Sequence, residues 1–466
     1  MRLRMPNTFV LLFSILALIA LATWFVPGGK YETHLVNGRQ LVDPDSFHYV
    51  ASSPQGAVAL LKAPIRGFVE SAQIIGFVLF VGGAFAVLQR TEAIDTLIRS
   101  IARAHRHSPL VRALVIPVFV VLFSLGGATF GMNEEVIPFI LIFVPLALAL
   151  GYDTVVGVSI PFLGSQVGFG AAFLNPFNVG IAQGIAGVPV FSGIGYRLVV
   201  WAAATFVTVA FLMWYAARVK RNPALSPTYI LDQAKRREMT AAHEGECEPA
   251  DARMSGRHAS VLVLFALTLA AMVVGVVKFE WFIDEIAALF LAMAIVVGLV
   301  ARLGADDWVA AFLQGVKDLA PTALVIAIAR ATMVIAREAH IIDTMLHALM
   351  PLVQSSHPVF AAQKMYLIQS VINFFIHSGS GQAALTMPIM APLADLVGVS
   401  RQTAILAFQL GELSTSMIPT SGITVGVLAL ARIPWLTWAK WMIPLQLIYL
   451  VLSLLLLVPP CLMDWQ

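Results

Sequence analysis

Charged residues are scarce in this sequence, because Asp, Glu, Lys and Arg together make up 12% of its 466 residues. Soluble domains carry roughly 25% charged residues, whereas hydrophobic residues make up 59% of this chain. A water-soluble chain of this length could not bury so much apolar surface. The composition therefore excludes a soluble globular protein and predicts an integral membrane protein. The formal net charge of +3 indicates no nucleic-acid partner.

Cysteine is equally scarce. The two cysteines, Cys247 and Cys461, are too few for a disulfide framework and lack the spacing of metal ligands. The sequence also lacks a clustered acid, base and nucleophile. We therefore expect no enzyme, no cofactor and no resident metal.

A cleaved secretory leader is not expected either. Arg2 and Arg4 precede the apolar run 9–26, but this run is longer than the apolar region of a leader. The residues Trp24-Phe25-Val26-Pro27 also lack the small-residue pattern of a cleavage site. We interpret the run as the first membrane helix.

The apolar runs differ in length. About 20 residues are needed to cross the hydrocarbon core as a helix, and several runs are clearly shorter. The short runs occur in pairs at corresponding positions of the two halves, which is typical of re-entrant hairpins and of helices broken within the membrane. The runs comprise residues 9–26, 67–88, 110–125, 135–150, 155–173, 179–190, 195–217, 259–277, 281–301, 316–336, 361–376, 383–397, 403–417, 422–431 and 435–459.

The two halves also share sequence. The segment Ala93-Ile94-Asp95-Thr96-Leu97-Ile98 returns 248 positions later as Ile341-Ile342-Asp343-Thr344-Met345-Leu346. Further matches follow in order at shifts of 247 to 250 positions: Pro109 with Pro358, Gly131 with Gly381, Pro138 with Pro388, Gly151 with Gly398, and Leu163-Gly164 with Leu410-Gly411. An ordered series of this kind indicates an ancient duplication. In membrane proteins a long internal repeat is typical of secondary transporters, whose substrate site lies where the copies meet.

Basic residues predict the orientation of the chain, because cytoplasmic loops are enriched in Lys and Arg. The basic residues of the N-terminus and of the stretches 90–106 and 218–257 place all three inside. The first hairpin (110–150) then opens to the inside. Run 316–336 crosses in the opposite sense to run 67–88, so the second hairpin (361–397) opens to the outside. The prediction is an all-α protein of the bacterial inner membrane, multi-pass, with two inverted-topology repeats and a cytoplasmic N-terminus.

We divide the chain accordingly. Residues 90–106 alternate apolar and basic positions, as in an amphipathic helix lying on the inner leaflet. The charged stretch between the halves is expected to be partly flexible. The segments are residues 1–64 (first helix and outer loop), 65–217 (repeat 1), 218–257 (cytoplasmic linker), 258–304 (scaffold helices) and 305–466 (repeat 2).

Four interruptions hold most of the small polar residues expected at membrane depth. Glycine allows tight turns and close approach of a ligand. Unpaired amides at a helix start suit a carboxylate, and free carbonyls suit a cation such as sodium. Proline removes a backbone donor and is expected to unwind the helix. The candidate binding residues are Thr129, Gly131, Asn133, Glu134 and Glu135 (first tip); Asn175, Pro176 and Asn178 (first break); Ser378, Ser380, Gly381 and Gln382 (second tip); and Thr415, Ser416, Pro419, Thr420 and Ser421 (second break). The alternative is that these are packing glycines and kinking prolines.

Charged residues near these interruptions have functional and structural interpretations. A carboxylate at membrane depth is costly and is a functional candidate, so Glu134 or Glu135 could bind a substrate amine, a coupling proton or sodium. They could instead complement the dipole of the returning arm. Glu412 is a third acidic candidate. Arg330 could hold a substrate carboxylate, neutralise one of these glutamates or form a structural ion pair, and His377 is expected to be a hydrogen-bonded tip residue.

With these tips and breaks, the chain resembles the C4-dicarboxylate anaerobic carrier family, and most closely its YfcC branch, whose members are described as candidate basic amino acid antiporters. The resemblance covers nearly the whole chain and is strongest at residues 123–139, 164–187 and 377–432. It implies an elevator-type fold of the INDY kind, with inverted repeats, a dimerising scaffold and a mobile domain that holds two hairpins and two broken helices. A homodimer is therefore expected.

The tips depart from those of the sodium/dicarboxylate members, which read Ser-Asn-Thr. Here the first tip reads Thr129-Phe-Gly131-Met-Asn133-Glu134-Glu135 and the second Ser378-Gly-Ser380-Gly381-Gln382. Two acids at one tip would repel a dianion, which favours a substrate with an amine, such as an amino acid. We expect a secondary transporter of small carboxylate-bearing solutes, coupled to sodium, protons or exchange. A C4-dicarboxylate carrier is the nearest alternative; an ion channel and a membrane-embedded enzyme are more distant ones.

Overall fold

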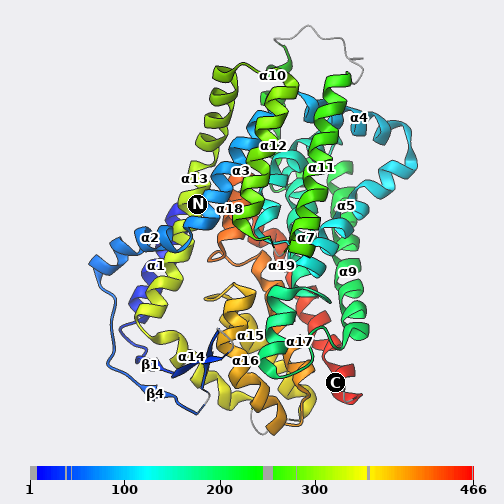
Figure 1. Cartoon of the computed structure of the whole chain (residues 1–466). Helices are drawn as coiled ribbons and strands as arrows, with labels where there is room; N and C mark the ends of the chain where they lie inside the picture. The colour runs from blue at the N-terminus through cyan, green and yellow to red at the C-terminus, as the bar shows by residue number, and fades with distance from the viewer. Residues whose placement is uncertain are drawn as a thin grey trace.

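The computed structural model describes residues 8–36, 39–43, 45–244, 255–279, 281–353, 357–463 and 465, which form a tall bundle of helices (Figure 1). The helices of the first half are α1 (Thr8–Ala22), α2 (Ala57–Glu70), α3 (Ala72–Arg90), α4 (Ala93–His107), α5 (Pro109–Phe130), η1 (Glu134–Phe139), α6 (Ile140–Ala149), α7 (Thr154–Gly170), η2 (Pro176–Gly180), α8 (Ile181–Ala186), α9 (Ile194–Arg221), η3 (Pro223–Leu225) and α10 (Tyr229–Glu244). Those of the second half are α11 (Gly256–Phe279), α12 (Ile283–Ala301), α13 (Ala305–Glu338), α14 (Ile341–Leu349), η4 (Met350–Leu352), α15 (Pro358–Asn373), α16 (Gly379–Leu396), α17 (Arg401–Gly411), η5 (Glu412–Ser416), α18 (Gly422–Leu430), α19 (Trp435–Leu456) and α20 (Val458–Leu462).

Seven helices of the described residues are long and apolar enough to cross a membrane. They lie at Ala72–Arg90, Pro109–Phe130, Ile194–Arg221, Gly256–Val276, Ile283–Ala301, Ala305–Glu338 and Trp435–Leu462. The predicted first span is shorter than expected, because α1 has 15 residues. Its chain turns at Thr23, whose hydroxyl donates to the Ala20 carbonyl and accepts the Gln55 amide at 2.8 Å.

Short strands interrupt the predicted all-helical pattern between α1 and α2. The strand β1 (Gly29–Lys30) pairs antiparallel with β4 (His48–Tyr49). The strand β2 (Thr33–Val36) pairs antiparallel with β3 (Arg39–Val42). Both pairs fall in the segment that we expected to be an outer loop.

Element boundaries recur at the spacing of the sequence repeat. The stretch from the start of α2 to the end of α3 corresponds to the single long helix α13, because Ala57 and Ala305 lie 248 positions apart, as do Arg90 and Glu338. Glu92 and His340, also 248 positions apart, precede α4 and α14 with left-handed φ values of 59° and 57°. A non-glycine residue seldom adopts this conformation, so its recurrence supports the duplication independently of residue identity.

Each half contains a pair of helical arms packed against a broken helix. The arms α5 and η1–α6 both pack on α7, and the arms α15 and α16 both pack on α17. The predicted breaks are present: α7 ends at Gly170 and helix resumes at Pro176, and η5 ends at Ser416 and helix resumes at Gly422.

Two details of these segments differ from expectation. Gly126 and Gly127 lie within α5 rather than in the tip, because they allow close packing: a β-carbon at Gly127 would lie 2.2 Å from the Ser165 carbonyl oxygen of α7. The first arm is consequently 22 residues long and the turn is confined to residues 131–133. Pro176 begins η2 rather than unwinding a helix, since the lost donor is unused at a helix start.

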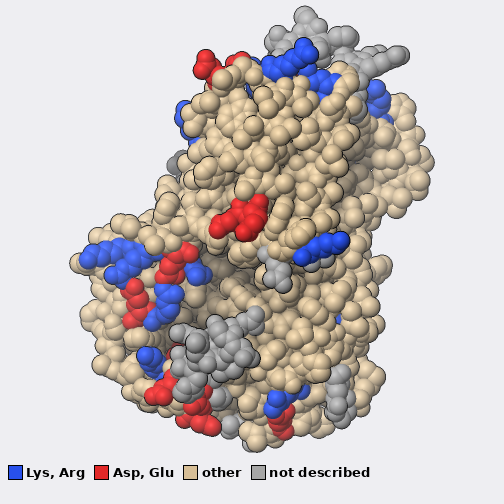
Figure 2. Space-filling model, in the orientation of Figure 1, with Lys and Arg blue, Asp and Glu red and all other residues tan. Residues whose placement is uncertain are grey.

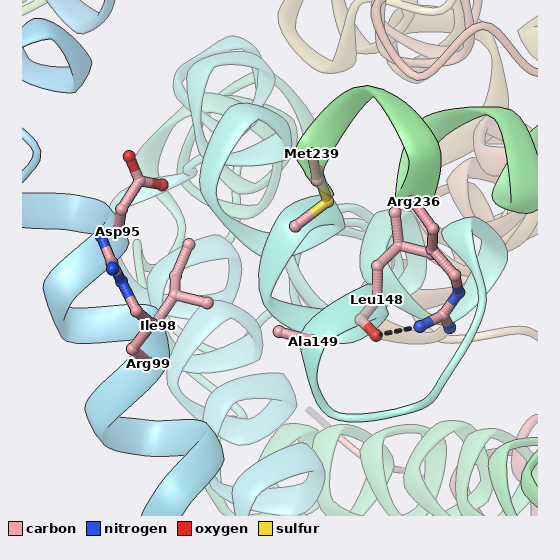
Figure 3. A pocket seen from close by; sticks show the side chains of 7 residues that line it. All are labelled: Asp95, Ile98, Arg99, Leu148, Ala149, Arg236 and Met239. Carbon is pink, nitrogen blue, oxygen red and sulfur yellow. Dashed lines mark hydrogen bonds between the residues drawn. The ribbon is translucent and has the colours of Figure 1, made fainter. Parts of the chain in front are cut away.

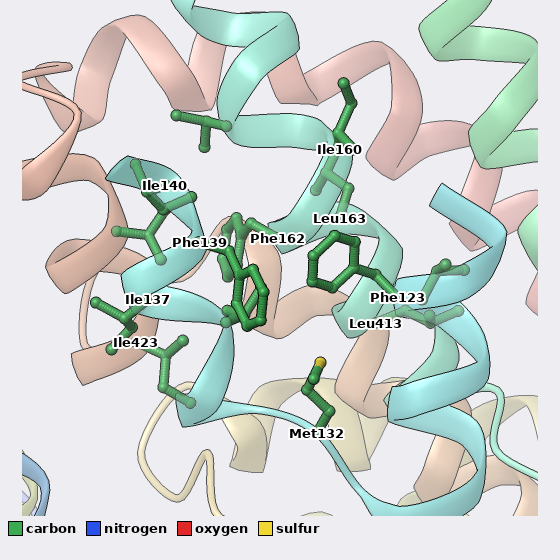
Figure 4. Packing of buried hydrophobic residues seen from close by; sticks show 14 of the residues in the cluster. Phe123, Met132, Ile137, Phe139, Ile140, Ile160, Phe162, Leu163, Leu413 and Ile423 are labelled. Atoms are coloured by element: carbon green, nitrogen blue, oxygen red, sulfur yellow. The ribbon is translucent and has the colours of Figure 1, made fainter. Parts of the chain in front are cut away.

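The apolar core continues from these arms into the breaks. Phe123 of α5 packs edge-on against Phe139 and Phe143 of the returning arm, with ring centroids 5.1 and 5.4 Å apart. Figure 4 shows Phe123 and Phe139 beside Phe162 of α7 and Leu413 of η5. The core therefore ties the first hairpin to elements from both halves.

The stretch expected to be a flexible linker contains a helix. Helix α10 is anchored by Arg236, which donates to the carbonyls of Leu148 at 2.6 Å and Tyr152 at 2.7 Å. Residues 245–254 of the same stretch lie outside the described residues. The predicted amphipathic helix at 90–106 corresponds to α4, which buries Ile94, Ile98 and Ala102 along one side.

Candidate functional site

Candidate residues from the tips and breaks meet around the last turns of α7. Near this end of the helix, the Ser165 hydroxyl donates to the Met132 carbonyl, and Gln166 Nε2 donates to Asn133 Oδ1 at 2.6 Å. These bonds hold the first tip. Phe169, one turn further along, contacts the second tip. Because an α-helix rises 1.5 Å per residue, the two tips are attached to α7 within roughly 6 Å of each other along its axis.

The first tip turns at Gly131, which has a left-handed φ of 76°. A β-carbon there would lie 2.8 Å from Asn175 Oδ1 and 2.7 Å from the Phe177 ring, so the first tip packs closely on the first break. Asn175 in turn donates to the Gly127 carbonyl at 3.2 Å and accepts the Phe177 amide at 2.8 Å. Asn175 is therefore a structural clamp between α5 and the first break.

The two adjacent acids of the first tip have different surroundings. Glu135 is 9% exposed and folds back, with Oε2 accepting the Asn133 amide at 2.8 Å. This bond matches the alternative in which the carboxylate caps the returning arm. Glu134 is half-buried. The returning arm begins as the short 3₁₀ turn η1 rather than as an α-helix, so this tip presents no α-helix start to a ligand.

The second tip does present an α-helix start. Ser378 caps the 18-residue helix α16, its hydroxyl accepting the Gly381 amide at 3.4 Å. A β-carbon at Gly379 would lie 2.8 Å from Glu412 Oε1 and 3.0 Å from Asn178 Cβ. Glu412 is 4% exposed, and its Oε2 accepts Asn178 Nδ2 at 2.9 Å. The second tip and both breaks thus meet at one buried carboxylate.

The second break is held by side chains of α15 and of α19. Asn373 Nδ2 donates to Ser414 Oγ at 2.9 Å and to Thr415 Oγ1 at 2.8 Å. Trp435 and Trp438 donate to the Met417 and Ser416 carbonyls at 2.9 and 2.8 Å. These bonds fix the position of the non-helical backbone, which includes Pro419.

The remaining candidates bond within their own turns, except Thr420, whose partner lies 46 positions away. Thr129 donates to the Leu125 carbonyl, Ser416 to Leu413, and Thr420 to Phe374. Ser421 caps α18 by accepting the Thr424 amide, and Ser380 lies 3.4 Å from the Ser378 hydroxyl. Among these residues, Ser378 is the exposed one.

The sequence interpretation named Gln382 and His377 but missed Gln369 and Asn373 of the second hairpin. Four buried polar atoms of the second hairpin have no hydrogen-bond partner within the described chain: Gln369 Nε2, Asn373 Oδ1, His377 Nδ1 and Gln382 Oε1. Buried polar atoms are usually paired, so this concentration marks a place suited to a polar ligand. Gln369, Asn373 and His377 are spaced four residues apart, a pattern that could have indicated a common face of the arm.

Arg197 was also missed. This α9 residue is 0% exposed, and its guanidinium donates to Gln409 Oε1 and, at 3.0 Å, to Gln402 Oε1. The ion pairs of the described residues do not include it. It contributes a buried positive charge to the same bundle that buries Glu135 and Glu412.

Arg330 forms a structural ion pair rather than neutralising Glu134 or Glu135. Its Nε lies 3.3 Å from Glu70 Oε2 of α2, and Arg337 pairs with the same carboxylate. In Figure 2 a mixed group of acidic and basic side chains lies at the lower left, over α2 and α13, beside a hollow in the surface. Arg330 also acts electrostatically on His377 of the second tip.

A separate polar region lies at the upper end, where Figure 2 shows Lys and Arg side chains over α10. A cavity of about 510 Å³ lies between α4 and α10, lined by Asp95, Arg99 and Arg236 (Figure 3). Lys235 of α10 donates to the Ala431 carbonyl at 2.7 Å, and its burial lowers its pKa to about 8. This region contacts both halves but contains none of the candidate binding residues.

Two known proteins are similar to this chain over most of its length. The chain is 36% identical over 476 aligned positions to the Escherichia coli (strain K12) protein named "Putative basic amino acid antiporter YfcC", covering 94% of this chain and 92% of the relative. It is 27% identical to a Haemophilus influenzae protein described as an "Uncharacterized protein", with 97% and 96% coverage.

Comparison with solved structures finds two transport proteins at low sequence identity. The YdaH transporter of Alcanivorax borkumensis gives a TM-score of 0.43 at 16% identity and 99% coverage of both chains. MtrF of Neisseria gonorrhoeae, described with a class of antimetabolite efflux pumps, gives 0.42 at 17% identity, with 99% and 95% coverage.

The family assignment follows from the sequence match, which is longer than any single motif. A model of the family described as "C4-dicarboxylate anaerobic carrier" matches residues 5–460. This match covers both tips, both breaks and the seven candidate spans except for the last two residues of the seventh. Together with the 36% identical relative, it shows that the chain is a membrane transporter that belongs to the C4-dicarboxylate anaerobic carrier family.

Proposed function

We propose that this protein is a secondary active transporter of small carboxylate-bearing solutes, and that amino acids, including basic ones, are its substrates. The observation that carries the proposal is the meeting of the second tip with both breaks at Glu412, beside buried amides without partners. Such a site offers amide donors to a carboxylate and carboxylates to an amine.

Substrate charge is the second part of the proposal. Glu134 is half-buried at the first tip, next to Glu135. Two acids at one tip favour a substrate amine or a coupling cation over a dianion. The name of the 36% identical relative supports a basic amino acid, whereas the family name supports the alternative, a C4-dicarboxylate.

Alternating access is the proposed mechanism. Helices α1, α2, α3, α11, α12 and α13 would form a scaffold, and the hairpins with their broken helices would move as one body against it, with the two repeats inverted in the membrane. The pairing of α13 with α18 supports this boundary, since β-carbons at Gly422 and Gly426 would lie 3.3 and 3.4 Å from Ile326. A homodimer joined through the scaffold completes the proposal.

Counterflow in liposomes tests the function. Purified protein loaded with unlabelled solute should accumulate labelled L-arginine or a neutral amino acid with saturation, and succinate should compete poorly. Succinate outcompeting arginine would favour the dicarboxylate alternative. Flux that does not saturate would indicate a channel, and chemically altered solute would indicate an enzyme.

Substitution of the first-tip acids tests charge recognition. We expect Glu134→Gln to lower kcat/KM for arginine by about 10- to 100-fold, because a hydrogen bond to a charged group contributes about 1.5–3 kcal/mol. Glu238→Gln, at an exposed position of α10, is the matched control and should not change it. Arginine uptake that survives both Glu134→Gln and Glu135→Gln would refute charge recognition by this tip.

A further inference from the structure

We propose that Glu412 carries a coupling proton, and that its carboxylate competes with the substrate carboxylate for the start of α16. This inference rests on the proposed function and adds a coupling ion and a residue to it. Its starting point is the geometry of Oε1. That atom lies 2.8 Å from where a β-carbon of Gly379 would be, so it sits directly against the first residue of α16.

The start of α16 is the place where a substrate carboxylate would bind. Free amides and the helix dipole favour one negative charge there. Among the described residues, the backbone bonds of the tip engage the Gly381 and Gln382 amides, and none involves the amides of Gly379 or Ser380. Two carboxylates cannot share this position without strong repulsion. Glu412 must therefore become neutral, or leave, when a carboxylate substrate arrives.

The surroundings of Glu412 favour neutralisation of its carboxylate by a proton. The one hydrogen bond found for it in the described residues comes from the neutral amide of Asn178. None of the ion pairs in the described chain includes it. A carboxylate held at membrane depth by a neutral partner is costly to keep charged. Uptake of one proton gives the carboxylic acid, which still accepts from Asn178.

Other titratable groups are too distant to replace that proton. Helix α7 and η2 carry none. The groups on the other elements packed around η5 are Lys364 and Tyr366 (α15), Asp395 (α16), Arg401 (α17), and Lys440 and Tyr449 (α19). Three of these groups are far along their helices from the site. Lys364 lies nine residues before Asn373, Arg401 lies eleven residues before Glu412, and Asp395 lies sixteen residues after Gly379. Each separation corresponds to about 13 Å or more along the helix. Lys440 is exposed, Tyr449 pairs with Thr208, and Tyr366 is a neutral phenol.

The nearest titratable side chain of the second tip is His377, two residues before Gly379. The charge that acts on it comes from Arg330. At the first tip, Glu135 is bonded to the Asn133 amide, and its neighbour Glu134 completes the set of acids at the tips. The buried Arg197 is held by Gln402 and Gln409 on the preceding turns of α17. None of these side chains hydrogen-bonds to Glu412 in the described residues.

The substrate would find its remaining contacts beside this carboxyl group. Gln369, Asn373 and Gln382 are fully buried and each has an unpartnered polar atom. A β-carbon at Gly411 would lie 3.0 Å from Gln369 Cβ, which places this group next to η5. A carboxylate that displaces the Glu412 charge thus enters a site that already has spare donors and acceptors.

In the proposed transport cycle, one proton moves in the same direction as each substrate. The Glu412 carboxylate takes a proton, the substrate carboxylate binds at α16, both are carried, and both are released on the other side. A carboxylate substrate therefore moves together with one proton. Above the pKa of Glu412, the KM of a carboxylate substrate should rise with pH by up to about tenfold per pH unit, since one proton is exchanged.

The test uses full-length protein in liposomes that contain a pH-sensitive dye, with L-arginine and succinate as probes. Wild-type uptake should carry protons inward, and KM should rise with pH. In Glu412→Gln, substrate-driven proton movement should be lost and KM should no longer depend on pH. Glu238→Gln is the control and should behave as wild type. A Glu412→Gln variant that keeps proton movement and a pH-dependent KM would overturn the inference.

Infrared difference spectroscopy gives an answer that does not depend on identifying the solute. Titration of wild type between about pH 5 and pH 9 should show a protonated carboxyl band that Glu412→Gln lacks, because burial shifts such groups into this range. Identical spectra would overturn the inference. Failure of the proposed function is distinguishable, since it appears as wild-type protein that carries neither probe.

Discussion

Individual glycines determine how closely the broken helix α7 approaches the first hairpin. A β-carbon at Gly168 would lie 2.0 Å from the Ser124 carbonyl oxygen, and one at Gly164 would lie 2.9 Å from that of Val120. Small residues let membrane helices come close, and their packing replaces the hydrophobic effect that lipid does not provide. The position of the first tip therefore depends on glycines, which have no side chain to keep the two helices apart.

Gly168→Ala tests this dependence. The added methyl would meet backbone, which cannot rotate away, so we expect the variant to be destabilised by about 1–3 kcal/mol, the usual cost of overpacking. Gly76→Ala is the matched control, because a β-carbon at this helical position meets nothing within 4 Å. The thermal midpoint of each variant in detergent is the measurement. Equal midpoints would contradict close α5–α7 packing.

Helix α10 is the element that joins the two halves. Asp232 Oδ1 accepts the Thr154 amide of the first half at 3.0 Å, and Lys235 donates to the Ala431 carbonyl of the second half at 2.7 Å. A polar helix of 16 residues has little intrinsic stability in water. Its helical state therefore depends on these contacts with both halves.

Lys235 makes the stability of this region depend on pH. Burial lowers its pKa from 10.5 to about 8, so the unfolded chain binds more protons between these values, and the free energy of unfolding should rise as pH increases from about 8 to about 10.5. Lys235→Met removes this contribution. We expect the thermal midpoint of wild type to rise relative to that of Lys235→Met as the pH increases over this range. Parallel pH profiles would contradict a depressed pKa.

At the scale of the whole molecule, basic side chains gather at the end of the bundle that carries α10 (Figure 2). The strand pairs lie at the opposite end, near α14 (Figure 1). Cytoplasmic loops of membrane proteins are enriched in Lys and Arg. The α10 end is therefore the proposed cytoplasmic face.

Cysteine labelling tests this orientation. In a Cys247→Ser, Cys461→Ser background, Gln233→Cys on α10 should react with an impermeant maleimide in inside-out vesicles. Ala51→Cys, which is exposed before α2, should react in spheroplasts. The reverse pattern would contradict the orientation and the cytoplasmic N-terminus derived with it.

Local composition predicted the breaks, the tips and α4, because glycine, proline and polar clusters act within a few residues. The position of Glu412 against Gly379 and Asn178 could not be predicted, since it joins segments that lie 33 and 234 positions apart. Arg197 was missed because its partners Gln402 and Gln409 are neutral and distant in sequence. Helix α10 was missed because carbonyls of Leu148 and Tyr152, rather than its own composition, hold Arg236.

The joint between α2 and α3 has no counterpart in α13. Ser71 closes α2 by donating its amide to the Gly67 and Phe68 carbonyls at 3.0 and 3.2 Å, and Figure 1 shows α2 turning away from the line of α3. The equivalent helix runs unbroken through Pro321. The first copy thus has a joint between two helices where the second copy has one continuous helix. The duplicated parts are no longer interchangeable, because a change of angle needs only the α2–α3 joint in the first copy but a bend within a continuous helix, at Pro321, in the second.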